Sequence, residues 1–259
     1  MIRVYPESHK ANNPMNRGFN TILAAQFFSS LGDNALLFAA IALLKNLDAP
    51  SWQTPVLQQF FVIAFIVLAP FVGAFSDALP KGQVMFISNS IKIVGCTAML
   101  LGLHPLLAYG FVGIGAALYS PAKYGILTEC LPPHRLVWAN GWMEGLTVAA
   151  IILGAIFEGI LLGHRVEEQV VQQLGGLEFN GGIDTAPEFA IFVILGLYLV
   201  AAILNYFIPK LPIEHTLTKR TPGYLLADFW RSFRLLWKDP LGQVTKFDNY
   251  GNHRESPYP

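Results

Sequence analysis

The sequence predicts an all-α membrane protein with six transmembrane helices, and two observations support this fold class. Of the 259 residues, 53% are hydrophobic and only 13% are charged, whereas soluble domains have about 25% charged residues. The chain also contains six apolar runs, most of them close to the roughly 20 residues that a helix needs to cross a bilayer. This composition excludes a soluble enzyme, a disordered chain and a nucleic-acid-binding protein with a basic surface.

The six apolar runs follow one another with short connections along most of the chain. In order, they cover residues 21–44, 55–76, 84–103, 106–119, 138–162 and 189–208. The fourth run is short when only apolar residues are counted, so we expect its helix to continue towards Leu127. Strands of a transmembrane barrel would instead be about 10 residues of alternating polarity. Continuous runs of this length therefore predict helices.

The positive residues predict how the helices are oriented. Fourteen of the 17 Lys and Arg residues lie in the N-terminal tail, in the loops after the second and fourth runs, or after the sixth run. Lys45 and Arg165 lie on the opposite side. Because positive residues stay in the cytoplasm, we expect both termini there. The predicted organisation is a cytoplasmic tail (1–20), a six-helix bundle (21–209), a cytoplasmic linker (210–247) and a disordered end (248–259).

The linker contains a segment of a different kind. In residues 224–238, apolar side chains fall on one helical face and Arg231, Arg234 and Lys238 on the other. This pattern is typical of a helix that lies flat on a membrane surface. The last twelve residues are polar and lack the apolar run that would begin a seventh span. This ending raises the hypothesis of a truncated or frameshifted product.

Asp33 is the clearest candidate for a functional residue. It lies near the middle of the first run, where an acidic residue costs about 2.5–3.5 kcal/mol to insert. Gln26, Ser29 or Ser30, and Asp33 recur at helical spacing, which predicts a polar face that lines a water-filled cavity. The alternative is a packing carboxylate that a hydroxyl or amide of a neighbouring helix satisfies.

Three other charged residues lie within or beside the runs. Glu144 shares a predicted face with Asn140 and Thr147, and it either faces the same cavity or reaches the cytoplasmic interface. Lys92 lies about 12 Å from the end of its helix at 1.5 Å per residue, so we expect it to extend to the interface. Lys123 either holds an anionic head group or is a loop lysine that only helps to set the orientation of the helices across the membrane.

Enzyme signatures are missing from the sequence. The six histidines have no metal-ligand spacing, and neither a nucleophile elbow nor a phosphate-binding loop is present. We therefore expect no catalytic residues, no metal and no cofactor. Two pairs of glycines four residues apart, Gly141/Gly145 and Gly159/Gly163, are typical of helices that pack closely together.

The loop after the second run carries a first resemblance. Gly73-Ala-Phe-Ser-Asp77-Ala-Leu-Pro-Lys81-Gly82 resembles the Gly-xxx-Asp-Arg-x-Gly motif of major facilitator transporters, which gates those proteins. Ala78 stands where that motif has arginine, and Lys81 is the nearest cation. Six spans with both ends inside resemble the N-terminal half of such a transporter.

Longer matches are similar to the bacterial lysophospholipid transporter family. They are Gly32-Asp-Asn34-Ala-Leu-Leu-Phe-Ala, Ala-Pro70-Phe-Val-Gly73, Tyr119-Ser-Pro-Ala-Lys123-Tyr-Gly-Ile-Leu and Ala139-Asn-Gly-Trp-Met-Glu144. The resemblance implies an inner-membrane carrier that moves lysophosphatidylethanolamine-type lipids inward, where a cytoplasmic acyltransferase re-acylates them. It implies no nucleic acid as partner.

With the polar faces above, this resemblance gives a predicted substrate-binding set. Its residues are Gln26, Asp33, Asn34, Lys123 and Glu144. In this interpretation Asp33 pairs with an ethanolamine ammonium and Lys123 with phosphate. Two other functions remain open: an exporter of another small molecule from the same superfamily, and a membrane scaffold that transports nothing.

Overall fold

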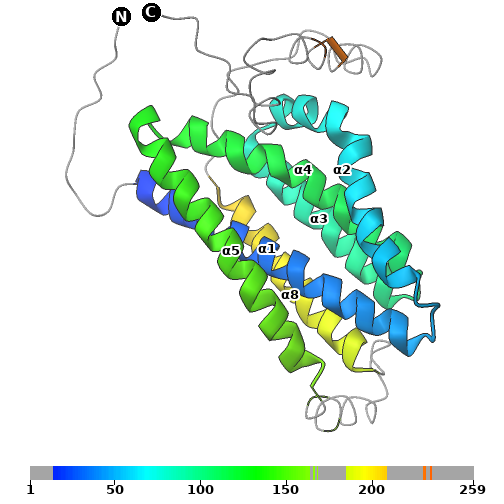
Figure 1. The fold of residues 1–259 in the computed structure, drawn as a ribbon. Helices are drawn as coiled ribbons and strands as arrows, with labels where there is room; N and C mark the ends of the chain where they lie inside the picture. The colour runs from blue at the N-terminus through cyan, green and yellow to red at the C-terminus, as the bar shows by residue number, and fades with distance from the viewer. Residues whose placement is uncertain are drawn as a thin grey trace, which may run out of the picture. The chain divides into compact units, whose positions relative to one another are not determined.

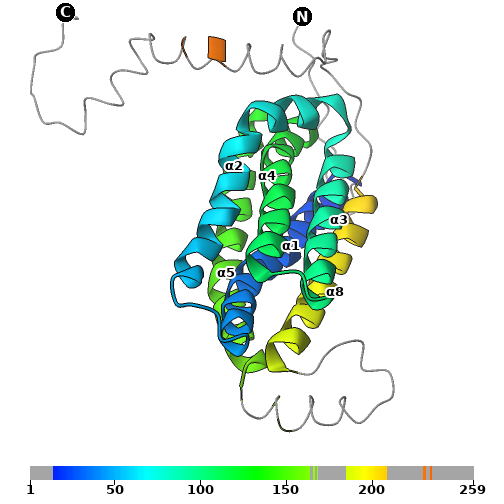
Figure 2. The ribbon, with the colours of Figure 1, turned by 90° about the vertical axis from the view of Figure 1, so that its right-hand side faces the viewer.

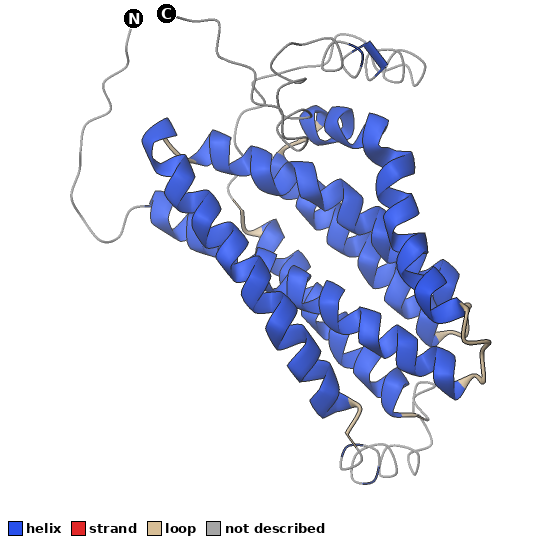
Figure 3. Cartoon of the chain, viewed as in Figure 1, coloured by secondary structure: helices blue, strands red, loops and turns tan. Residues whose placement is uncertain are grey.

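The computed structural model describes residues 14–163, 166, 168, 185–208, 230, 231 and 234. Within these residues it contains helices and no strands (Figure 3). Six helices are long and apolar enough to cross a membrane. Their bounds are α1 (Pro14–Asn46), α2 (Gln53–Ala78), α3 (Lys81–Leu100), α4 (Pro105–Cys130), α5 (Leu136–Leu161) and α8 (Ala186–Tyr206), with a 3₁₀ turn, η1 (Pro133–Arg135), before α5. The predicted all-α membrane fold is confirmed.

The fourth helix continues beyond its apolar run, as the sequence predicted. α4 extends to Cys130 and continues through Pro121, well beyond the apolar run that ends at Tyr119. Ser120 and Lys123 interrupt the hydropathy of this segment but do not interrupt its backbone. Lys123 lies buried within the helix, so a polar residue that turns inward shortened the apolar run without ending the helix.

The six helices form two groups of three. α2, α3 and α4 pack together, and α1 packs between α5 and α8 (Figure 1). Contact between α3 and α8 joins the groups, and these two helices lie side by side in Figure 2. The chain divides into units 1–216 and 217–259, and the bundle belongs entirely to the first.

Small residues bring α3 and α4 close together. A Cβ atom on Gly115 would lie 2.6 Å from the backbone oxygen of Ser88, and one on Gly95 would lie 2.8 Å from Val112. The predicted glycine pairs do not do this: Cβ atoms on Gly141, Gly145 and Gly159 would meet nothing within 4 Å. Gly141 and Gly145 each follow a buried residue of α5 by two positions, about 200° round the helix. They therefore face away from the bundle.

Two apolar clusters form the core, with polar residues between them. The Leu36 cluster includes Leu36, Leu44, Met99, Val112 and Ile194. The Ile126 cluster includes Ile22, Met85, Ile126, Met143 and Ile208. On α1, residues 26–33 separate the members of the two clusters, and buried Gln26 and Ser29 lie in this interval. The polar residues thus form a layer across the bundle.

Several predicted segments lie mostly or wholly outside the described residues. These are most of the N-terminal tail, the loop between α5 and α8, and the end at 248–259. Of the predicted surface helix at 224–238, the structure describes Trp230, Arg231 and Arg234, all helical and exposed. Its position on a membrane stays a prediction, as do the predicted domain boundaries.

Candidate substrate-binding site

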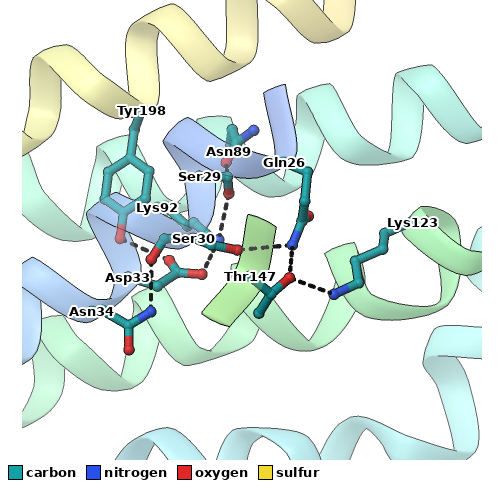
Figure 4. A network of polar contacts seen from close by, with 10 residues as sticks. All are labelled: Gln26, Ser29, Ser30, Asp33, Asn34, Asn89, Lys92, Lys123, Thr147 and Tyr198. Atoms are coloured by element: carbon teal, nitrogen blue, oxygen red, sulfur yellow. Dashed lines mark hydrogen bonds and ion pairs between the residues drawn. The ribbon is translucent and has the colours of Figure 1, made fainter. Parts of the chain in front are cut away.

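The polar face of α1 turns into the bundle. Gln26, Ser29 and Ser30 are buried, and Asp33 is partly buried. Residues three and four apart lie on one side of a helix, so these side chains meet α3, α5 and α8 rather than lipid (Figure 4). The spacing noticed in the sequence therefore marks the interior face of α1.

Asp33 is held by two other helices. Lys92 of α3 donates to Asp33 Oδ2 at 2.7 Å, and the hydroxyl of Tyr198 on α8 donates to Asp33 Oδ1 at 2.8 Å. The close approach of α8 requires Gly32, because a Cβ atom there would lie 2.9 Å from the Tyr198 ring. Both oxygens of the mid-helix carboxylate are satisfied within the protein.

The structure corrects the position expected for Lys92. Its side chain does not extend to the interface but turns inward, with only 1% of its surface exposed. Besides Asp33 it donates to Ser29 Oγ at 2.9 Å, and its ammonium lies 5.2 Å from the Tyr119 ring centroid. The helix begins at Lys81, three residues before the predicted run, and distance along the helix does not show the direction in which Lys92 points. A buried cation of this kind must be paired, and the Asp33 carboxylate supplies the opposite charge.

A second ion pair joins α4 and α5. Lys123 Nζ lies 3.5 Å from Glu144 Oε1, and Tyr124 donates its hydroxyl to the same oxygen at 2.7 Å. The Lys123 ammonium also lies 4.8 Å from the Tyr124 ring centroid. The Lys123 side chain is 10% exposed and that of Glu144 is 50% exposed. This pair therefore reaches solvent or a ligand at its acidic end.

Gln26 connects α1 to this second pair. Its amide nitrogen donates to Ser30 Oγ at 2.8 Å and to Thr147 Oγ1 of α5 at 3.1 Å. Lys123 lies 3.5 Å from the same Thr147 oxygen (Figure 4). The amide oxygen of Gln26 is buried without a hydrogen-bond partner. These contacts thus bring Gln26, Lys123 and Glu144 together.

Asn34 and Asp33 lie apart from this group of contacts. The side-chain amide of Asn34 donates to the Ser30 backbone oxygen at 2.8 Å. Among the described residues, the partners of Asp33 are Lys92 and Tyr198, and neither Lys123 nor Glu144 bonds to it directly. The predicted set of five residues is therefore divided. Lys92 and Tyr198 hold Asp33, Asn34 bonds within α1, and Gln26 lies with Lys123 and Glu144.

The gating motif residues form a cluster at the junction of α2 and α3. Lys81 Nζ lies 2.6 Å from Asp77 Oδ1, 2.9 Å from the Ser76 backbone oxygen and 3.9 Å from Glu129 of α4. A Cβ atom on Gly82 would lie 3.1 Å from Ile208, whereas one on Gly73 would meet nothing. Lys81 is therefore paired with Asp77, the acidic residue of the motif. The gating role of these residues stays a prediction.

The sequence interpretation did not single out three buried residues, Tyr198, Asn89 and Glu158. Tyr198 gave no signal, because a tyrosine in an apolar run is common. Asn89 and Lys92 did give one, since they are three residues apart on α3 and both are polar. Glu158 of α5 is 0% exposed and was also not singled out. No group of three His, Cys, Asp or Glu residues that could hold a metal ion is found in the described part of the chain.

Curated relatives are similar in sequence to most of this chain. It is 41% identical over 230 residues to the lysophospholipid transporter LplT of Yersinia enterocolitica, covering 88% of this chain and 52% of the relative. The LplT protein of Yersinia pestis strain Pestoides F is 42% identical with the same coverage. This chain spans about half the length of these relatives. They are transporters rather than enzymes, in agreement with the absence of an enzyme motif.

A solved structure has a similar fold. It is the crystal structure of a bacterial homologue of the human lysosomal transporter Spinster, in an inward-facing and unoccupied conformation. Its TM-score is 0.64 at 16% identity, and the match covers 89% of this chain and 50% of that one. The family model of the Major Facilitator Superfamily matches residues 22–245. These residues include the whole helical bundle apart from the start of α1, and the chain therefore belongs to the major facilitator superfamily.

Proposed function

We propose that this chain forms the N-terminal half of a lysophospholipid transporter, and that the Lys123–Glu144 pair receives the lipid head group. The observation that carries the proposal is the half-exposed ion pair at one end of an apolar stripe. Glu144 is followed on the same face of α5 by Val148, Ile152 and Ile156, each more than half exposed. A lysolipid has this same division between a charged head and a single apolar chain.

The chemistry of the pair suits a phosphate-containing head group. The Lys123 side chain is only 10% exposed. Its distance to Glu144, 3.5 Å, is longer than the 2.7 Å between Lys92 and Asp33. A phosphate could replace Glu144 as the partner of Lys123 and form a stronger charge-assisted bond. Glu144 would then be available for an ethanolamine ammonium. The stripe from Glu144 to Ile156 is about 18 Å long at 1.5 Å per residue, and it offers the acyl chain an apolar surface.

The enclosed Asp33 has a different role in this proposal. Its carboxylate already accepts bonds from Lys92 and Tyr198, so binding an ammonium there would require breaking the internal pair. In this proposal the ammonium site therefore lies at Glu144 rather than at Asp33, whereas Lys123 keeps the phosphate that the sequence interpretation assigned to it. Asp33 instead joins α1 to α3 and α8.

Further parts of the proposal rest on resemblance alone. They are a bacterial inner membrane, cytoplasmic termini and a cytoplasmic acyltransferase that uses the transported lysolipid. Major facilitator sites lie between two halves that rock against each other. We therefore expect six helices alone to insert without transporting lysolipid.

The test is uptake of labelled lysophosphatidylethanolamine into vesicles that contain this chain joined to a second six-helix half. We expect Lys123→Ala to reduce uptake by at least tenfold and to leave the amount of folded protein unchanged. Lys45→Ala is the matched control, since Lys45 lies exposed in the last turn of α1. Equal uptake by the Lys123→Ala and Lys45→Ala proteins would contradict the proposed site. Transport of a drug or sugar, but not of lysolipid, would favour the alternative exporter.

A further inference from the structure

The contact between α1 and α5 contains a carboxyl group that belongs to neither ion pair. α5 has a line of buried residues at spacings of three and four: Ala150, Gly154, Glu158 and Leu161. At Gly154 the two helices approach closely, because a Cβ atom there would lie 3.2 Å from the backbone nitrogen of Ala35. Glu158 lies one turn further along the same line and is 0% exposed.

Among the described residues, the carboxyl group of Glu158 has no hydrogen-bond partner. Both of its oxygens are buried and unbonded in the structure. Its neighbours along α5, Phe157 and Leu161, belong to or pack against the Leu36 cluster. An apolar environment therefore surrounds a group that is ordinarily charged.

The charged groups on the helices that pack against α5 are already paired or lie at helix ends, and α4 also carries the buried tyrosines Tyr109 and Tyr119. On α1, Asp33 is bonded to Lys92 and Tyr198, and Lys45 lies exposed in the last turn. On α8, Tyr198 donates to Asp33, and Glu188 is bonded to Thr185 in a capping box at the start of the helix. On α4, Lys123 faces Glu144. Among the described residues, Glu158 takes part in no ion pair or hydrogen bond.

An isolated ionised carboxylate in an apolar site carries a far larger desolvation cost than a neutral acid does. We propose that Glu158 is a proton-binding site, which is occupied when α1 and α5 are in contact and emptied when they separate. On closing, a proton from water binds one carboxylate oxygen, and the contact between the helices then contains no net charge. On opening, that proton returns to water and leaves a hydrated carboxylate.

The site would make the contact between α1 and α5 sensitive to the proton concentration. Where this contact opens and closes during transport, each cycle would carry a proton on Glu158. That consequence rests on the proposed transport function, whereas the proton site itself does not. The two can fail separately, because the measurements below use no lipid substrate.

The first test is infrared absorption by the purified chain at neutral pH. A protonated carboxyl group absorbs through its C=O stretch in a region that is distinct from ionised carboxylate. We expect a protonated-acid band that Glu158→Gln removes and that Glu144→Gln, the matched control on the same helix, retains. If Glu158→Gln removes no such band, Glu158 is ionised and the proposal is wrong; binding of Na⁺ instead of a proton would give this same negative result.

The second test is thermal stability as the pH rises from neutral to alkaline. The unfolded chain loses the Glu158 proton readily while the folded chain must keep it, so the unfolded state binds fewer protons and stability falls with pH. We expect this fall in the wild-type chain and a flatter profile in Glu158→Gln. If Glu158→Gln does not fold, Glu158→Leu, which also carries no charge, should give the same flatter profile. Parallel profiles for the wild-type and variant chains would overturn the proposal.

Discussion

The Asp33–Lys92 pair and the Glu144–Lys123 pair contain the same three groups but differ in how open they are. In each, a lysine faces a carboxylate that also accepts a bond from a tyrosine hydroxyl, Tyr198 or Tyr124. The lysine–carboxylate distance is 2.7 Å in the first pair and 3.5 Å in the second. The carboxylate side chain is 22% exposed in the first and 50% in the second.

This difference indicates what each pair does. A buried pair loses its water, so removing one partner strands a charge in a low-dielectric interior. An exposed pair keeps much of its hydration and contributes little to stability, so it can exchange partners at low cost. The first pair therefore joins three helices, and the second is suited to recognition of a ligand.

Removing one lysine from each pair tests this comparison most strongly. We expect Lys92→Ala to lower the free energy of unfolding by about 3–5 kcal/mol, because Asp33 loses its counter-charge. Lys123→Ala should lower it by no more than about 1 kcal/mol. Thermal denaturation in detergent measures both. Adding Asp33→Asn to Lys92→Ala should restore part of the loss, and equal losses for the two single variants would contradict the division.

A glycine substitution beside the Asp33–Lys92 pair should also cost more stability than one beside the Glu144–Lys123 pair. A Cβ atom on Gly115 would lie 2.6 Å from the Ser88 oxygen and 2.7 Å from Lys92 Cγ, whereas one on Gly145 would meet nothing. We expect Gly115→Ala to cost about 1–3 kcal/mol through overpacking. Gly145→Ala should be neutral or stabilise α5 by up to about 1 kcal/mol. Denaturant titration of the two proteins would show whether the predicted order holds.

The two tyrosine hydroxyls provide a finer comparison. Tyr198→Phe keeps the ring but removes a bond to the charged Asp33, and bonds of this kind contribute about 1.5–3 kcal/mol. Tyr124 is 44% exposed, so water can replace its hydroxyl at Glu144 and the loss should be under about 1 kcal/mol. Melting temperatures of the two Phe variants test this. A larger shift for Tyr124→Phe would mean that the α4–α5 pair is more enclosed in the membrane.

Salt should have the smallest effect and should act on one pair only. Double-mutant cycles at low and high ionic strength measure the coupling energy within each pair. We expect about 0.2–1 kcal/mol for Lys123 with Glu144 at low salt, decreasing as salt screens the exposed carboxylate. The coupling between Lys92 and Asp33 should be unchanged by salt. Equal salt sensitivity in both cycles would show that water reaches the buried pair.

The sequence predicted the architecture well and the site only in part. Continuous apolar runs gave the six helices, because the length needed to cross a membrane is fixed by the bilayer. Helical spacing on α1 correctly grouped Gln26, Ser29, Ser30 and Asp33 on one face. Which helices that face meets depends on how the helices are rotated against one another, and hydropathy carries no such information.

Missing that rotation explains the errors at particular residues. Lys92 was placed by its distance from the helix end, although its stem lies against Gly115 and its ammonium faces Asp33. Gly141 and Gly145 have the spacing of a helix contact but face away from the bundle. The sequence also does not reveal that Lys92 and Tyr198 bond to both oxygens of Asp33, and the role of Asp33 towards an ammonium group stays a prediction.

A layer of polar residues separates the two apolar clusters. We therefore expect the parts of the bundle on either side of this layer to unfold locally and independently of each other. Each cluster buries its own side chains, and the bonds between them are local ones among a few helices. Hydrogen exchange of backbone amides reports such partial opening, because regions of different stability exchange at different rates. Amides of α4 around Ile126 should then exchange independently of those around Val112. We therefore expect the polar layer to be the place at which the bundle opens.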